Sequence, residues 1–161
     1  MNRRSTSRTK TVMQIANEKA IRHGQESVEP VHLLLGLVFE RSGVAARALR
    51  NLGIEPSSLQ AEGDLVFLKD DPCGSRRAQQ SQFHLPQSHR TKCVFESALE
   101  EADKLRHRAV DTEHLLLALV NVQDDDMVIQ ILAKLGVSPG NVRVEVMDLL
   151  GECETYELGN R

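Results

Sequence analysis

The stretch His32-Leu33-Leu34-Leu35 occurs twice in the chain, the second time as His114-Leu115-Leu116-Leu117. The similarity extends outward from this block: residues 6–38 align with residues 88–120, and 14 of these 33 pairs are identical. After an insertion of one residue the match continues, pairing Leu49, Leu52, Gly53 and Pro56 with Leu132, Leu135, Gly136 and Pro139. Composition alone gives about a couple of identities over such a window, so the chain contains an internal duplication.

The sequence pattern of each copy predicts four helices. The first begins after a hydroxyl residue, Thr6 or Ser88, whose side chain can accept a hydrogen bond from the opening turn. The second contains the leucine triplet and is apolar nearly all round, so we expect it to be the buried centre of its repeat. The third spans about 44–52 or 127–135, and Gly53 or Gly136 supplies the left-handed residue that ends it.

The fourth helix opens at a proline in each copy, Pro56 or Pro139, which suits the first helical position. Its spacing predicts these inward-facing side chains: Leu59, Leu65 and Leu68 in one copy, and Val142, Val146 and Leu149 in the other. No strand pattern occurs, because valine and isoleucine recur at helical spacing. The fold class is therefore all-α, with two tandem four-helix repeats related by a pseudo-twofold axis. We expect the repeats at about 5–68 and 88–152, a linker at 69–87 and a tail at 153–161.

The composition and the missing motifs argue against several classes of function. A net charge of −3 argues against a nucleic-acid partner, and no apolar run is long enough to span a membrane. The 3 cysteines form no CxxC pair, which favours a reducing, cytoplasmic location and no zinc site. The chain also lacks a GxxxxGK[ST] loop and any nucleophile–base pair. We therefore expect no enzymatic activity and no cofactor, and the oligomeric state stays open.

The two histidines that precede the leucine triplets are candidates for catalytic residues. The sequence places no cysteine, acid or further histidine to complete a metal site or a triad with His32 or His114. We expect both to be structural histidines whose ring nitrogens bond to the backbone. The spacing of His107 fits no metal pattern, so we expect it on the surface.

These residues resemble the Clp N-terminal (repeat R) domain, the double four-helix module at the front of ClpC- and ClpA-type unfoldases. The blocks that carry the resemblance, which covers about residues 5–152, are Glu113-His114-Leu115-Leu116-Leu117-Ala118-Leu119, its partner His32-Leu33-Leu34-Leu35-Gly36-Leu37, and Gly43-Val44-Ala45-Ala46-Arg47-Ala48-Leu49. The resemblance implies a docking platform for adaptor and substrate proteins, some of them phosphorylated on arginine. Without an ATPase module, we expect a free-standing Clp-N protein that binds such ligands or docks on Clp ATPase or protease subunits, with an excised domain of a longer protein as the open alternative.

Glu113 has two interpretations. A carboxylate at a helix start stabilises that end by ~0.3–1 kcal/mol. The resemblance implies instead that the matching glutamate holds the guanidinium of phosphoarginine while helix-start donors hold the phosphate. On this second interpretation Ser88, at the matching hydroxyl position, assists Glu113, and Thr6 is its equivalent in the first repeat. Val31 occupies the glutamate position of the first repeat, so that pocket lacks its carboxylate.

A helical DNA-binding regulator is the alternative. Short helices and a basic start, Arg3-Arg4 with Arg8 and Lys10, favour it. Phosphate binding needs a concentrated basic face, however, and the basic residues are spread over both repeats.

Overall fold

The structure is a computed structural model that describes residues 5–68, 84–121 and 126–158. These residues form eight helices and no strand, which confirms the all-α prediction. The helices are α1 (Ser7–Arg22), α2 (Pro30–Glu40), α3 (Val44–Asn51), α4 (Pro56–Leu68), α5 (His89–Lys104), α6 (Thr112–Asn121), α7 (Asp126–Lys134) and α8 (Pro139–Leu158). Among the described residues, no helix is long and apolar enough to cross a bilayer.

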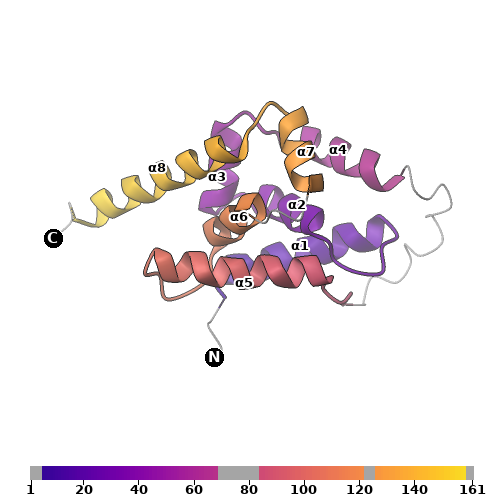
Figure 1. Ribbon diagram of the computed structural model, residues 1–161, viewed down its shortest axis with the longest axis horizontal. Coiled ribbons are helices and arrows are strands. Elements are labelled where there is room, and N and C mark those ends of the chain that lie inside the picture. Colours follow the sequence, from indigo (N-terminus) through magenta and orange to yellow (C-terminus); the bar gives the residue numbers. More distant parts are fainter. Residues whose placement is uncertain (1–4, 69–83, 122–125, 159–161) are drawn as a thin grey trace.

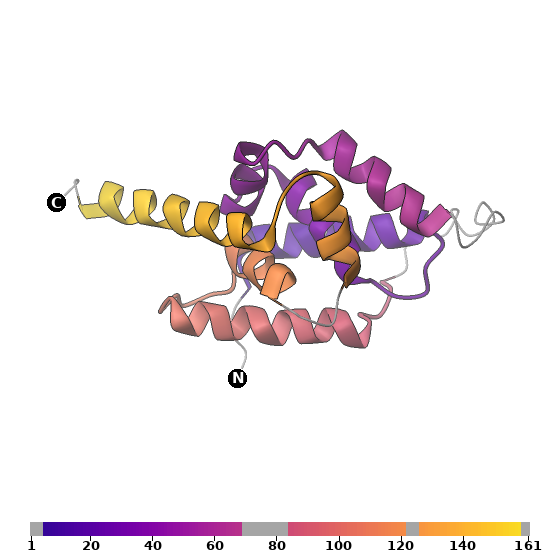
Figure 2. The ribbon, with the colours of Figure 1, turned by 45° about the horizontal axis from the view of Figure 1, so that its top comes forward.

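The second helix of each repeat lies at the centre. Figure 1 shows α2 and α6 between α1 and α5 on one side and the four remaining helices on the other. α2 contacts α1, α3 and α4, and α6 contacts α5, α7 and α8. The repeats also interlock, since α3 packs on α6 and α8 and α2 packs on α7. α8 runs past residue 152, where the second repeat was expected to end, and projects from the body (Figure 2).

The predicted helix ends are confirmed. Thr6 and Ser88 cap α1 and α5, accepting hydrogen bonds from the amides of Thr9 (3.3 Å) and Thr91 (3.2 Å). Gly53 and Gly136 have φ angles of 84° and 78°, a conformation that side chains with a Cβ rarely adopt. α3 and α7 therefore end where the sequence predicts.

The core is aliphatic and extends through both repeats. The leucines of both triplets are 0% exposed, as expected for the central helices. Gly36 allows α1 and α2 to approach closely, because a Cβ at this position would lie 2.6 Å from the carbonyl oxygen of Val12. Burial of this continuous apolar surface is the main source of stability in such a fold.

One prediction about the core is wrong. Leu65 is 50% exposed, and the buried residues of α4 are Leu59, Gly63 and Phe67. These three recur at a spacing of four residues, whereas Leu65 lies on the opposite side of the helix. The side chain of Leu68 and most of the expected linker, residues 69–83, lie outside the described residues.

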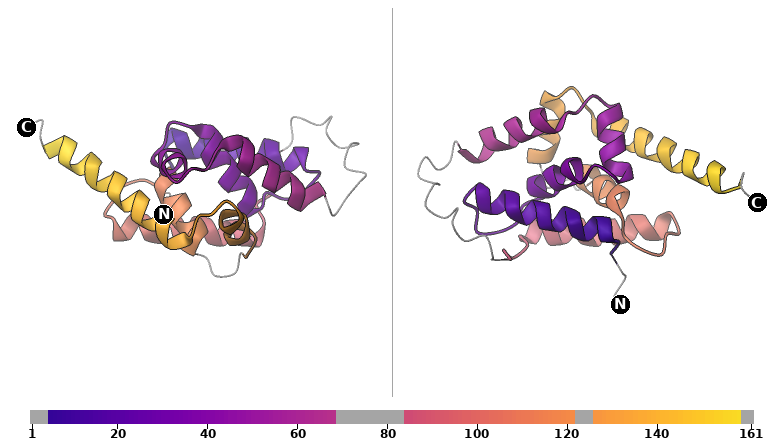
Figure 3. Two further views of the ribbon diagram at one scale, coloured as in Figure 1. Left: turned by 90° about the horizontal axis from the view of Figure 1, so that it is seen from above. Right: turned by 180° about the vertical axis from the view of Figure 1, so that it is seen from behind.

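The two repeats are joined crosswise at the helix starts. The amide of Thr6 and the hydroxyl of Thr9 donate to the carbonyl of Val110, at 3.1 and 2.9 Å. The amide of Ser88 and the hydroxyl of Thr91 donate in the same way to Val28, at 3.1 and 2.6 Å. The first helix of each repeat therefore begins beside the start of the other repeat's second helix. Seen from above, in the left view of Figure 3, α1 and α5 lie on opposite sides of the central pair.

Candidate functional site

The crosswise contacts create a polar corner that contains the predicted site residues. We call the group Thr6, Arg8, Asp111, Thr112 and Glu113 the Thr6–Glu113 corner. The Thr6 hydroxyl donates to Asp111 Oδ1 over 3.0 Å, and Arg8 Nη1 lies 3.7 Å from Asp111 Oδ2. Asp111 also caps α6, because its Oδ1 accepts a hydrogen bond from the Thr112 amide at 2.7 Å. One carboxylate thus links the starts of α1 and α6.

Glu113 lies in the first turn of α6 and is 7% exposed. Burial raises the pKa of its carboxyl to about 7, an effect that its own backbone hydrogen bond and the Arg8 charge only partly offset. Near neutral pH the side chain is therefore divided between its protonated and ionised forms. A cation that enters beside it would stabilise the ionised form, so the position suits a guanidinium or ammonium group.

The structure separates Ser88 from Glu113. The hydroxyl beside the start of α6 is that of Thr6, whereas Ser88 lies at the start of α2, beside Val28. The expectation that Ser88 assists Glu113 is therefore wrong, because the repeats exchange partners at their helix starts. The corner around Ser88 instead includes the position of Val31, which is 2% exposed and carries no charge.

The two repeated histidines accept backbone hydrogen bonds through Nδ1. His114 Nδ1 accepts from the Asp111 amide at 2.8 Å, and His32 Nδ1 accepts from the Glu29 amide at 2.9 Å. The Nε2 atom of each contacts a second histidine: His114 lies 2.8 Å from His107 Nδ1, and His32 lies 3.2 Å from His23 Nδ1. Neither neighbour was predicted, since His23 and His107 are not aligned in the duplication and carry no signal in the sequence.

His107 completes a group that resembles a metal site. Potential ligand atoms of His107, Glu113 and His114 lie within 4.8 Å of one another, so an acid and a second histidine lie beside His114 that the sequence did not indicate. The tautomer argues against a metal here. Because His114 Nδ1 accepts from an amide, its proton is on Nε2 and donates to His107. Nε2 then has no lone pair for a metal, and a metal-bound histidine normally donates from its other nitrogen.

Burial keeps both repeated histidines neutral. It lowers the pKa of His32 to about 3 and that of His114 to about 4, with a further contribution from the neighbouring histidine in each case. In the first repeat the chain of contacts continues to Asp64, whose Oδ1 lies 2.7 Å from His23 Nε2. The arrangement fixes the start of each central helix.

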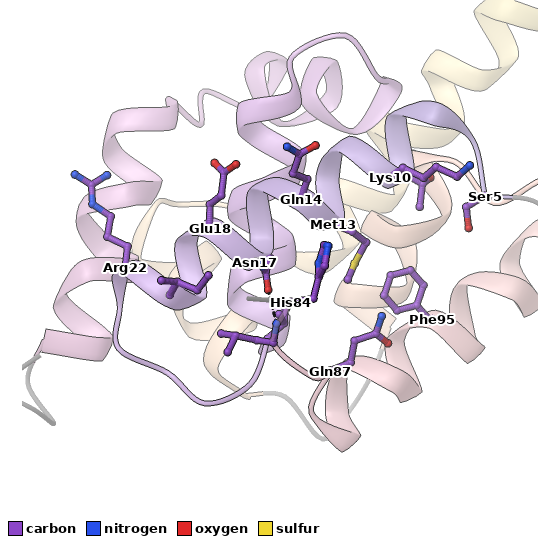
Figure 4. Close-up of a pocket in the computed structure, with 14 residues that line it drawn as sticks. Ser5, Lys10, Met13, Gln14, Asn17, Glu18, Arg22, His84, Gln87 and Phe95 are labelled. Atoms are coloured by element: carbon purple, nitrogen blue, oxygen red, sulfur yellow. Dashed lines mark hydrogen bonds between the residues drawn. The ribbon is translucent and has the colours of Figure 1, made fainter. Parts of the chain in front are cut away.

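A groove of about 1400 Å³ runs along α1 and ends at Ser5, the residue before Thr6. Its wall is formed by α1, by the segment around Leu85 and by Phe95 of α5. Figure 4 shows Asn17 and His84 near its middle, Met13 and Phe95 toward the end with Lys10 and Ser5, and Arg22 at the other end. The Leu85 amide donates to Asn17 Oδ1 over 2.8 Å, so a side chain of this groove accepts a hydrogen bond from the chain's own backbone.

Fold and corner together define a duplicated four-helix module whose two repeats interlock at their helix starts. The model of the Clp repeat (R) N-terminal domain matches residues 4–84 and 87–160. The chain is 36% identical over 152 residues to the negative regulator of genetic competence ClpC/MecB of Bacillus subtilis, and 38% identical over 153 residues to the chaperone protein ClpB of Oceanobacillus iheyensis. Each match covers 94% of this chain but only 18% of the relative.

A solved structure agrees with the fold. The N-terminal domain of the caseinolytic protease-associated chaperone ClpD from Arabidopsis thaliana superposes with a TM-score of 0.71 at 21% identity. The superposition covers 94% of this chain and 97% of that domain. The chain belongs to the Clp repeat (R) N-terminal domain family, whose members are in general protein-interaction modules.

Proposed function

We propose that the chain is a non-catalytic protein-binding module of the Clp system, and that its Thr6–Glu113 corner binds arginine-phosphorylated segments of adaptor or substrate proteins. The observation that carries the proposal is the buried carboxylate of Glu113, two residues after Asp111, which accepts a hydrogen bond from Thr6 at the start of α1. In phosphoarginine the phosphoryl group is bonded to a nitrogen of the guanidinium. A site for it needs a carboxylate and an anion-binding group side by side.

The corner supplies both chemistries. Glu113 offers a carboxylate oxygen to guanidinium N–H groups, a charge-assisted and directional interaction. The start of α1 offers backbone amides and the positive end of its dipole, which are suited to phosphate. Arg8, whose side chain is 48% exposed, would contact the same phosphate. Asp111 opposes an anion, and its contact with Arg8 partly balances that charge.

The groove along α1 favours a segment of polypeptide over a free small molecule. It combines the apolar surface of Met13, Ile21 and Phe95 with the charges of Lys10 and Glu18. Since it ends at Ser5, a chain lying in it reaches the corner without crossing the body of the domain. Residues flanking the modified arginine would then add affinity through burial of apolar area.

Titration calorimetry with free phosphoarginine tests the proposal at pH 8, where Glu113 is ionised. Removing one charged partner from a desolvated pair costs ~2–5 kcal/mol, so Glu113→Gln should weaken binding at least tenfold. Val31→Ala, at the apolar counterpart, is the matched control and should bind like the wild type. Arginine and inorganic phosphate offered separately should bind far more weakly than phosphoarginine. Wild-type affinity in Glu113→Gln, or the absence of any binding, would refute the proposal.

A further inference from the structure

A second pocket lies at the other end of the first repeat, where α2, α3 and α4 meet. We call it the Arg41–Arg50 pocket, and we propose that it binds an acidic segment of a partner protein, with an aliphatic side chain on its floor and carboxylates against the two arginines. This surface is separate from the Thr6–Glu113 corner, so the inference goes beyond the proposed function.

The pocket has an apolar floor and a basic rim. Its volume is about 270 Å³, enough for one or two side chains. Val38, Ala46 and Ile54 form the floor and are 4%, 5% and 2% exposed. Arg41, at the end of α2, and Arg50, in the last turn of α3, line the pocket and are exposed.

The guanidinium groups are available to a ligand. Neither Arg41 nor Arg50 forms an ion pair with any residue that the structure describes. The adjacent acid, Glu40, is engaged elsewhere: its Oε2 accepts hydrogen bonds from the amides of Ser42 at 3.2 Å and Gly43 at 2.8 Å. Glu55 also lines the pocket, and its charge opposes an acidic ligand. Two unpaired guanidiniums against one carboxylate leave the pocket with a net positive charge.

The backbone at Arg41 has an unusual conformation. Its φ angle is 68°, in the left-handed region where glycine is favoured and a side chain with a Cβ is strained. The chain carries a long cationic side chain at a helix end where glycine would be more stable. Arg106 has a similar φ angle of 57° outside this pocket, so what distinguishes Arg41 is the position of its guanidinium at the rim.

The pocket belongs to the first repeat alone. Where the duplication aligns Leu49 with Leu132, the next pair is Arg50 and Ala133, so the second repeat lacks this guanidinium. The proposed ligand therefore binds one site per chain. Arginine matches the planar, two-oxygen geometry of a carboxylate, and the apolar floor favours a peptide with an aliphatic residue over a bare phosphate.

Fluorescence polarisation with a fluorescein-labelled peptide containing Asp-Leu-Asp tests the inference. Arg50→Ala should weaken binding about tenfold, and Glu55→Gln should tighten it two- to threefold because an opposing charge is removed. Arg41→Gly should also weaken binding about tenfold while raising Tm by about 3 °C, since the backbone strain is relieved. That combination separates lost binding from lost folding.

Two controls isolate the pocket. Glu113→Gln should bind the acidic peptide like the wild type, and Arg50→Ala should bind phosphoarginine like the wild type, so this inference and the proposed function fail independently. A peptide containing Asn-Leu-Asn should bind at least tenfold more weakly than the acidic one. Equal binding of the two peptides, equal affinity in the wild type and both arginine variants, or displacement by equimolar inorganic phosphate would overturn the inference.

Discussion

The hydroxyl of Thr6 donates a hydrogen bond to the carboxylate of Asp111, 3.0 Å away and 105 positions further along the chain. Both residues are helix caps, Thr6 for α1 and Asp111 for α6. The bond therefore ties the start of the first repeat to the centre of the second. Neither repeat can form its complete helix starts alone, which predicts that the duplicated module folds as one unit.

Thr6→Val should destabilise the fold by about 1–3 kcal/mol, because it removes both a cap and a hydrogen bond to a charged group. A double-mutant cycle with Asp111→Asn, followed by urea denaturation, should give a coupling free energy of about 1 kcal/mol. Ser88→Ala is the control and should lose only about 1 kcal/mol, since the Ser88 hydroxyl bonds to Thr91 within its own helix. Strict additivity of Thr6→Val and Asp111→Asn would contradict the interlocked arrangement.

Gly36→Ala should be severely destabilising, by about 2–4 kcal/mol. A Cβ at Gly36 would lie 2.6 Å from a backbone oxygen of α1, which a rotamer change cannot relieve. Gly140→Ala is the matched control, because its Cβ would meet only the Ser138 hydroxyl at 4.0 Å. That substitution should be neutral or stabilising by up to about 1 kcal/mol. Similar thermal midpoints for the two variants would show that α1 and α2 do not cross at Gly36.

Glu113→Gln should change the pH dependence of stability. The folded-state pKa of Glu113 is raised from 4.5 to about 7, so its contribution to stability is greatest below pH 4.5 and is lost as the pH rises through 7. The variant should therefore be more stable than the wild type at pH 8, by about 2–3 kcal/mol, with a much smaller difference at pH 4. Urea denaturation at both pH values measures this. A difference that does not vary with pH would contradict a buried, titrating carboxyl.

His32 should make the fold sensitive to acid. Its pKa is lowered from 6.5 to about 3, so the unfolded chain binds the proton first, and stability is lost as the pH falls from about 6.5 toward 3. His32→Asn retains an acceptor near the Glu29 amide but does not titrate in this range. We expect a shallower loss of stability below pH 6.5 in this variant, measured in the Glu113→Gln background so that the opposing titration is absent. Parallel pH profiles would contradict a neutral, buried His32.

The sequence predicted the parts of the fold that local chemistry determines. The repeated leucine triplets predicted the two central helices. The structure also reproduces the helix ends that were predicted from Thr6, Ser88, Gly53 and Gly136. These features depend on residues a few positions apart. The exposure of Leu65 was not predicted. The buried face of α4 passes through Gly63, which has no side chain and so does not mark a core position in the sequence.

The site was only partly predictable. Glu113 was identified, but its hydroxyl neighbour was assigned to Ser88, and the structure places Thr6 there. Helical periodicity describes one helix at a time, so it cannot show that the two repeats exchange partners. The contact between His107 and His114 was not predicted, because His107 lies in a loop. Helical periodicity gives no information about which helix a loop residue contacts.

The most direct test of the central claim, that the Thr6–Glu113 corner is the ligand-binding site, is a two-dimensional amide NMR titration with a peptide containing one phosphoarginine at pH 8. The account predicts that the largest shifts fall at the start of α1, residues 6–9, and at the start of α6, residues 111–114, with smaller shifts along the groove at Met13 and Phe95. The same titration of Glu113→Gln should show these shifts strongly reduced. Shifts centred on Ser88 and Val31, or none at all, would contradict the claim.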